Sequence, residues 1–185
     1  MYNEQDFQSE LREHLNKDER LLWTGKPRDG VVFRGSDIFA IPFSLMWGGF
    51  AIFWVVMVAI SASVFFAIFG IPFVVIGLYF IFGRFWVDAK QRENTIYGIT
   101  ENRIIIKSGI FTKEIKSLNI RTLSDISVRE KVGGMGTISL GPPTSYGMWG
   151  SGMMWWPGVP KQPCLEFITN VKQVYILIVE QQNRK

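Results

Sequence analysis

The chain has 185 residues, a formal net charge of +4, one cysteine and one histidine. A single cysteine excludes an internal disulfide, and one cysteine with one histidine excludes the usual ligand sets of a zinc site. The charge is uneven, with −2 over residues 1–37 and +6 over residues 83–185. Positive charge beside an apolar block is typical of a cytoplasmic membrane flank, and an anionic membrane surface would also attract it.

Residues 1–37 are the predicted N-terminal helix and lead-in segment. Phe7, Leu11 and Leu15 recur every four residues, which indicates a short amphipathic helix over roughly 4–15. Helices that lie on membranes usually carry a basic polar face, whereas this one is acidic. We therefore expect it to pack on the soluble domain rather than on the bilayer.

The next segment, 38–87, is predicted to form two transmembrane helices. From Ile38 to Phe82 the chain holds 45 residues without a charge. One helix of that length would measure about 68 Å, more than twice the hydrocarbon thickness, so two spans near 39–60 and 64–86 are expected. The turn between them falls either at Ser61–Ser63 or at Phe69–Pro72. In the first case, Pro72 should kink the second helix.

Basic residues flank this block on both sides, whereas its centre carries no charge. We therefore expect a multi-pass protein of the cell (inner) membrane with both termini in the cytoplasm. The block holds no acid, base or histidine, which argues against a transporter or pump. Its glycines are expected to allow close packing between helices, or to face a partner. The candidate anchors at the membrane flanks are Arg34, Arg84, Trp86, Lys90 and Arg92.

Residues 88–185 are predicted to form a cytoplasmic β-rich domain. Five strands are expected in sequence, followed by a short strand at 164–168, while 170–182 fits a helix or a strand about equally. Three lysines on the early strands, Lys107, Lys113 and Lys116, are expected to be solvated edge residues. Contact with anionic headgroups or with an acidic partner is the alternative. The first five strands are expected near 95–100, 103–107, 112–119, 124–130 and 136–140.

A long loop at 142–163 interrupts the strands and is rich in tryptophan and methionine. Disordered loops are usually poor in aromatic residues, so this composition indicates a function or a core role. Three interpretations stay open: the loop folds back over the sheet, docks a partner protein or enters the membrane interface. A Cu(I) site built from its methionines is the least favoured interpretation. The candidate contact residues are Met148, Trp149, Met153, Met154, Trp155 and Trp156.

The order of these segments resembles the bacterial pleckstrin-homology (PH) membrane proteins. Residues 19–27, ERLLWTGKP, match an E-x-x-L-W-x-G-x-P segment that precedes the membrane anchor in that family. Residues 97–105, YGITENRII, match the Y-x-I-T-x-x-R-I-I hairpin that opens the domain after it. The resemblance implies an α+β membrane protein: a transmembrane helical hairpin and a PH-like bent antiparallel sheet closed by a C-terminal helix. It thereby favours a helix over 170–182.

No catalytic constellation is evident in the sequence. His14 is far from Cys164 along the chain, and the Gly133–Gly136 segment lacks the Lys and Ser/Thr of a phosphate loop. We expect no cofactor and no nucleic-acid partner. The predicted function is a non-catalytic membrane-anchored scaffold that binds a protein partner, or a second copy of itself, at the cytoplasmic membrane face. The alternatives are an accessory subunit of a transporter or channel complex and a sensor of anionic lipid headgroups.

Overall fold

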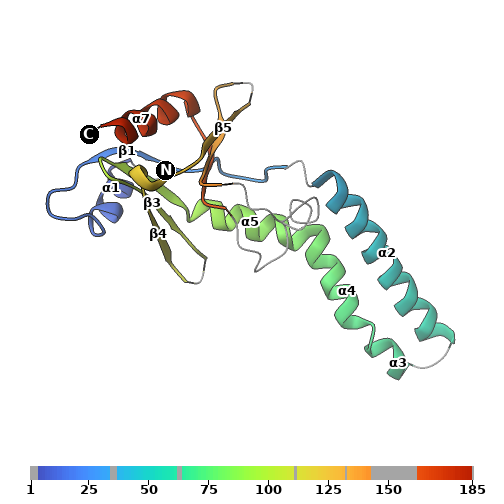
Figure 1. Ribbon diagram of the computed structural model, residues 1–185. Helices are drawn as coiled ribbons and strands as arrows, with labels where there is room; N and C mark the ends of the chain where they lie inside the picture. Colours follow the sequence, from blue (N-terminus) through green and yellow to red (C-terminus); the bar gives the residue numbers. More distant parts are fainter. Residues whose placement is uncertain are drawn as a thin grey trace. The chain divides into compact units, whose positions relative to one another are not determined.

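The structure is a computed structural model, and it describes residues 4–33, 37–61, 64–110, 112–131, 133–142 and 162–184. These residues divide into two compact units (Figure 1). The first unit is discontinuous and lies within Met1–Gly30, Lys90–Thr144 and Lys161–Lys185, and the second lies within Val31–Ala89. The chain therefore leaves the first unit near Gly30 and returns to it near Lys90.

The first unit begins with a helix and a four-stranded antiparallel sheet. The strands follow one another across the sheet in the order β1-β2-β3-β4. Gly109 has a φ of 137° in the turn between β3 and β4, where a Cβ would collide with the carbonyl oxygen of Thr112, so this turn requires glycine. The elements are α1 (Glu4–Arg12), β1 (Leu21–Gly25), β2 (Ile96–Thr100), β3 (Arg103–Ser108) and β4 (Glu114–Asn119).

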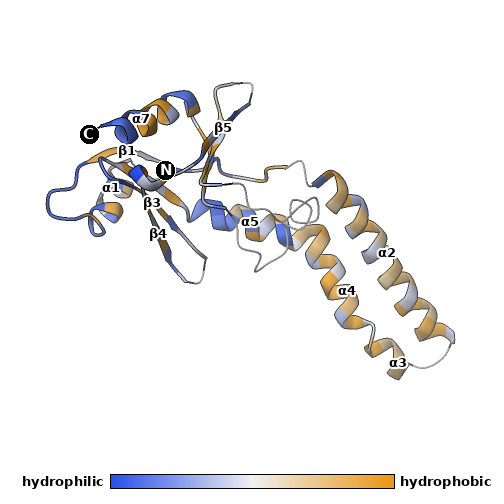
Figure 2. Cartoon of the chain, viewed as in Figure 1, coloured by the Kyte–Doolittle hydropathy of each residue, from blue (hydrophilic) through white to orange (hydrophobic). Residues whose placement is uncertain are grey.

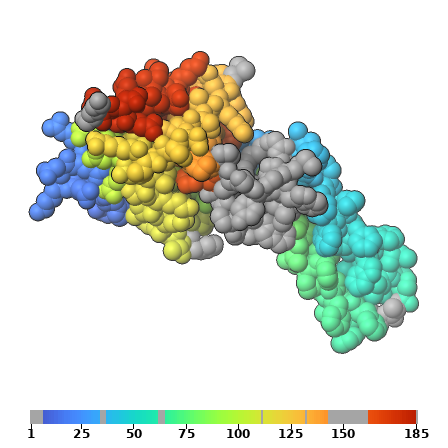
Figure 3. Space-filling view, viewed as in Figure 1, coloured from blue at the N-terminus to red at the C-terminus, as the bar shows by residue number. Residues whose placement is uncertain are grey.

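A second antiparallel sheet of three strands follows, in the order β5-β6-β7, and the final helix α7 closes the unit. Figure 3 shows the surface of α7 in contact with that of η2 and β5, in agreement with the packing of these elements. The elements are η2 (Ile120–Thr122, a 3-10 turn), β5 (Ile126–Glu130), β6 (Gly136–Leu140), β7 (Cys164–Ile168) and α7 (Val171–Asn183).

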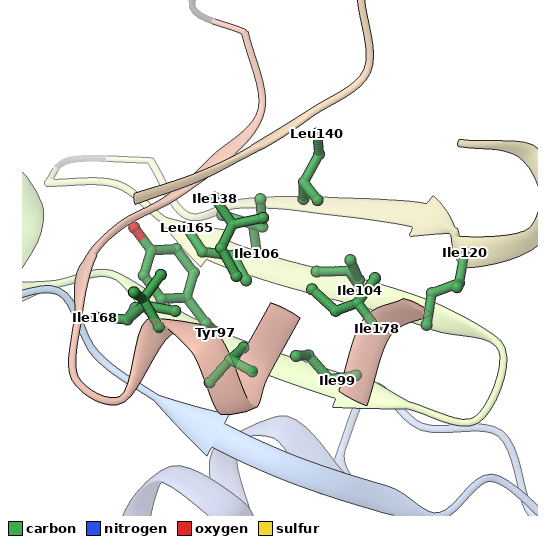
Figure 4. Packing of buried hydrophobic residues seen from close by; sticks show 12 residues of the cluster. Tyr97, Ile99, Ile104, Ile106, Ile120, Ile138, Leu140, Leu165, Ile168 and Ile178 are labelled. Carbon is green, nitrogen blue, oxygen red and sulfur yellow. The ribbon is translucent and has the colours of Figure 1, made fainter. Parts of the chain in front are cut away.

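The main core lies between the two sheets and α7 (Figure 4). The four-stranded sheet contributes the inward side chains of β2 and β3, including Ile99 and Ile104, and the three-stranded sheet contributes Ile138 and Leu165. On α7, positions 171, 174 and 178 are buried, a helical spacing that turns one face to the core. The segment 171–183 is therefore a helix, as the family resemblance implies, although its Val and Ile content also suits a strand.

Strand β1 was not expected from the sequence. Leu21–Gly25 pairs antiparallel with β2, with Trp23 opposite Ile99 and a bulge between Leu21 and Trp23. The sheet thus contains a strand that precedes the apolar block, and the block is inserted between two adjacent strands. The expected domain of 88–185 lacks this strand and α1. The predicted division into an N-terminal segment (1–37), two transmembrane helices (38–87) and a cytoplasmic domain (88–185) stays a prediction.

The second unit is a helical hairpin. Two helices, Asp37–Ser61 and Phe65–Glu93, are long and apolar enough to cross a membrane, and the last turn of the second helix belongs to the first unit. Figure 2 shows hydrophobic residues along α2 and α4 and mainly hydrophilic residues along α5. The second helix is a series of segments: α3 (Val64–Ile68), α4 (Ile71–Leu78), the π-helix η1 (Tyr79–Gly83) and α5 (Arg84–Glu93), while α2 spans Asp37–Ser61.

A break at Phe69 and Gly70 separates α3 from α4, and Pro72 lies in the first turn of α4. Gly70 is required there, because a Cβ would collide with the side chain of Val55 on α2. α2 ends at Ser61 and α3 begins at Val64.

Small residues form the interface of the hairpin. The buried side of α2 carries Ala40, Ser44, Gly48 and Ala51, while most of its large apolar side chains are exposed. A Cβ on Gly77 of α4 would lie 2.9 Å from the Cα of Gly48, so the two backbones approach closely. Gly48 and Gly77 therefore pack against each other inside the hairpin.

Candidate functional site

The first unit has two candidate functional features: the place where the hairpin joins the domain, and the face of the sheet that α1 covers. The first, here called the neck, consists of residues 26–30 and 90–95. The second, here called the helix-docking face, is the outer side of the four-stranded sheet. It comprises Leu21, Ile96, Gly98, Ile105 and Lys107.

The neck is fastened by Arg92, whose residue is 4% exposed. Its Nη1 donates to the carbonyl oxygen of Arg28 at 3.1 Å, and its Nη2 donates to that of Gly30 at 2.7 Å. Lys26 Nζ donates to the carbonyl oxygen of Glu93 at 3.1 Å. The planar, permanently charged guanidinium suits such a fork of two acceptors. The segment that leaves the domain is thus tied to the segment that returns.

Phe167, at the end of β7, also contacts the neck. Its backbone has a φ of 50°, an uncommon conformation for a residue other than glycine, and its carbonyl oxygen accepts from the backbone N–H of Arg28 at 3.1 Å. Two cations lie near its ring: Lys131 Nζ at 5.0 Å and the Arg92 guanidinium carbon at 5.9 Å from the centroid. The end of β7 therefore supports the chain that leads to the hairpin.

On the helix-docking face, α1 covers an apolar strip. Leu11 is fully buried and packs with Ile96 and Ile105, and Phe7, Leu15 and Leu21 pack around them. Gly98 forms the floor beneath Leu11, because a Cβ there would lie 3.0 Å from Leu11 Cδ1. The expectation that the acidic N-terminal helix packs on the domain is confirmed.

A buried lysine meets the acidic side of α1. Lys107 Nζ lies 2.9 Å from Glu10 Oε1 and 3.5 Å from His14 Nε2, and the Lys107 residue is 5% exposed. The hydrogen bond from Lys107 lowers the pKa of the Glu10 carboxyl. The expectation that Lys107 is a solvated edge residue is wrong: β3 lies inside the sheet, and α1 covers this side chain. Lys113, in contrast, is exposed and lies 3.6 Å from Glu10 Oε1.

Glu19, just before β1, is held by the β2–β3 hairpin. Arg103 donates to its carboxylate from Nε at 2.8 Å and from Nη2 at 2.6 Å, and Thr100 Oγ1 donates at 2.7 Å. These bonds, led by those from Arg103, lower the pKa of Glu19 to about 2, and Glu19 raises the pKa of Arg103. The Arg103 Nη2 also donates to the carbonyl oxygen of His14 at 2.9 Å. One guanidinium thus fixes the linker between α1 and β1.

The predicted site residues are placed as follows. The six methionines and tryptophans of the 142–163 loop lie outside the described residues, as does Arg34. Trp86 is exposed, and Lys90 Nζ pairs with Glu93 Oε2 at 2.9 Å. Arg84 is buried and its Nη2 lies 3.4 Å from Asp37 Oδ1, so the charges that bound the apolar block pair with each other. Arg92 fastens the neck, a role that the sequence did not indicate.

Among the described residues, no group of three or more His, Cys, Asp or Glu is placed to hold a metal ion. The sulfur of Cys164 lies 3.7 Å from Glu166 Oε1 on the same strand.

Antiparallel sheets of four and three strands closed by a C-terminal helix define a PH-like domain, here combined with an apolar helical hairpin. Residues 41–166, more than half of the chain, match the family model described as bacterial PH domain, and the chain belongs to this family. Neither a curated protein nor a solved structure matches the chain.

The structure also explains the two sequence motifs. Tyr97 is buried in the core, and its hydroxyl accepts from the backbone N–H of Glu166 at 3.1 Å, which joins the two sheets. Trp23 packs against the same core, and Glu19 of the first motif binds Thr100 and Arg103 of the second. The motifs thus hold together a domain that the hairpin divides in sequence.

Proposed function

We propose that this protein is a non-catalytic scaffold, anchored in the cytoplasmic membrane by its hairpin, whose PH domain binds other proteins at the cytoplasmic face. The observation that carries the anchor is the orientation of side chains in the hairpin. Gly48 and Gly77 meet in its interior, whereas large side chains such as Phe39 and Ile60, each 78% exposed, point outward. Lipid chains are the medium in which such a surface is stable.

The neck supports a topology with both termini in the cytoplasm. β1 and β2 are adjacent strands, and Arg92 ties the outgoing chain to the returning chain. An inserted pair of spans that begins and ends at one edge of one domain must return to the side of the membrane from which it left. Basic residues on both flanks, including Arg28 and Lys90, favour the cytoplasmic side.

The binding half of the proposal rests on the family and on loop composition. PH domains are generally non-catalytic interaction modules. The loop at 142–163 supplies side chains of the kind that dominate protein interfaces, with Trp155 and Trp156 as the strongest candidates. We propose that this loop makes the principal partner contact.

The test is photo-crosslinking in intact cells, followed by affinity capture from solubilised membranes. A photoreactive residue replaces Trp155 in one variant and exposed Trp86 in a control variant. We expect a discrete adduct at Trp155 that is abolished when Trp156 is also changed to serine. If position 155 gives no adduct except with lipid, while Trp86 crosslinks a larger membrane subunit, the accessory-subunit interpretation replaces the scaffold.

A further inference from the structure

The N-terminal helix α1 has contacts that resemble those of a bound ligand rather than those of an integral part of the fold. It has nine residues, fewer than an isolated helix needs to be stable in water, so its helical form depends on the face that it contacts. It packs on the outside of the four-stranded sheet, away from the main core between the sheets. Removal of α1 would leave that core covered.

The helix-docking face is specific in shape. Gly98 provides the depression that receives Leu11, and a larger residue there would fill it. Ile96 and Ile105 form its walls, and both are buried in one cluster with Leu11 of α1. Phe7 and Leu15, four residues before and after Leu11, complete the apolar contact.

The face is also specific in charge. Lys107 is buried beneath α1, where its ammonium needs an anionic partner, and Glu10 supplies it at 2.9 Å. His14 Nε2 lies 3.5 Å from the same Nζ, and exposed Lys113 lies 3.6 Å from Glu10. An occupant of this face therefore needs a carboxylate directly before the leucine that fills the depression.

The tether allows α1 to leave while the sheet stays intact. Glu19 is bound to Arg103 and Thr100, so the chain from residue 19 onward remains fixed to the sheet. Between α1 and Glu19, the side chains of Asn16, Lys17 and Asp18 are exposed. Exchange of α1 with a competing helix would break the hydrogen bond from Arg103 Nη2 to the carbonyl oxygen of His14, while the bonds to Glu19 hold the chain to the sheet.

We infer that the helix-docking face is a binding site for an amphipathic helix of a partner protein, and that α1 occupies it as an internal competitor. The partner helix carries an acidic residue followed by leucine, with apolar residues four positions before and after that leucine. α1 itself fits this pattern and defines it. The inference rests on the proposed scaffold function and adds a second contact that α1 regulates.

The experiment uses the full chain in lipid nanodiscs and a fluorescent peptide with the sequence of residues 4–18. Peptide binding is measured by anisotropy for the wild type and for two variants that weaken α1, Leu11→Ser and the double variant Phe7→Ser with Leu15→Ser. Because a tethered competitor acts at an effective concentration near the millimolar range, we expect both variants to bind the peptide at least about tenfold more tightly. Circular dichroism confirms that each variant keeps its folded domain.

Specificity is tested by charge exchange in the Leu11→Ser background. Lys107→Glu should weaken binding of the peptide about tenfold, and a peptide with lysine at the position of Glu10 should recover it. Gly98→Val, which fills the depression without changing charge, should weaken both peptides. Recovery by the exchanged peptide shows that a Lys107→Glu variant is folded.

Three results would overturn the inference. The first is equal peptide affinity of the wild type and of the two variants that weaken α1. The second is a peptide affinity that does not depend on the charge of residue 107. The third is a wild-type dimer that Leu11→Ser converts to a monomer, which would assign the face to α1 of a second copy. Since the titration does not involve the 142–163 loop, its failure leaves the crosslinking test of the scaffold function standing.

Discussion

Replacement of Glu19 by glutamine should abolish a defined part of the acid sensitivity of the domain. The carboxylate accepts two hydrogen bonds from Arg103, one from Thr100 Oγ1 and one from the backbone N–H of Asn16 at 3.1 Å. Its side chain is 4% exposed, so water screens these interactions little. Folding lowers its pKa from 4.5 to about 2.

The size of the effect follows from proton linkage. A pKa that falls from 4.5 to about 2 on folding corresponds to about 3 kcal/mol of stability. Because the folded pKa is the lower one, this contribution is complete above pH 4.5 and is lost as the pH falls towards 2. Glu19→Gln cannot ionise, so its stability should be lower than that of the wild type at pH 7 and should change less on acidification.

The assay is urea unfolding of the full chain in detergent micelles between pH 7 and pH 2, followed by far-ultraviolet circular dichroism. Between pH 5 and pH 2 the wild type should lose about 3 kcal/mol more than Glu19→Gln. Asp18→Asn, at an exposed neighbouring position, is the matched control and should follow the wild type. Parallel curves for wild type and Glu19→Gln would refute the assignment of this ion pair as the main acid-labile contact.

Three further outcomes are expected. Gly77→Val should force the hairpin helices apart, because its Cβ alone would lie 2.9 Å from Gly48 Cα. Gly49→Val should be tolerated, because nothing lies within 4 Å of a Cβ at that position. Spin-label distances across the hairpin distinguish the two variants. Arg92→Lys removes the guanidinium that donates to the carbonyl oxygens of Arg28 and Gly30. Because a charged hydrogen bond is lost, amide hydrogen exchange in the neck should become at least about tenfold faster. Ile178→Ala empties a fully buried position and should cost about 2–5 kcal/mol in urea unfolding, and an unchanged midpoint would place the core elsewhere.

The long apolar helices and the strands after them were predictable because their patterns are local. An uncharged stretch of this length has few alternatives to a helical hairpin. Around Thr100, runs rich in β-branched residues are separated by turn residues, a pattern that is typical of consecutive strands. α7 needed the family resemblance, since Val174 and Ile178 suit a strand as well as a helix. Its packing against both sheets stabilises the helical form.

Other features depend on contacts between segments far apart in the sequence. β1 has five residues without clear alternation, and its partner strand begins about 70 residues later, beyond the hairpin. Lys107 is buried because α1 covers it, and Arg92 is buried because the outgoing chain supplies carbonyl acceptors. Local sequence patterns predict a solvated edge position for Lys107 and a membrane-flanking anchor for Arg92. The acidic residues Glu10 and Glu19 were the available signal for paired basic residues, although the sequence does not identify which Lys or Arg each of them contacts.

The apolar hairpin interrupts a single PH domain between its first and second strands. The most direct test compares two proteins: one in which a short Gly/Ser linker joins Gly30 to Lys90, and one that contains only residues 88–185. We predict that the first is a soluble, cooperatively unfolding domain. The second lacks β1 and α1, exposes Ile96 and Ile105, and should aggregate or remain partly unfolded. A folded 88–185 fragment with the stability of the linked protein would contradict the insertion of the hairpin within a single domain.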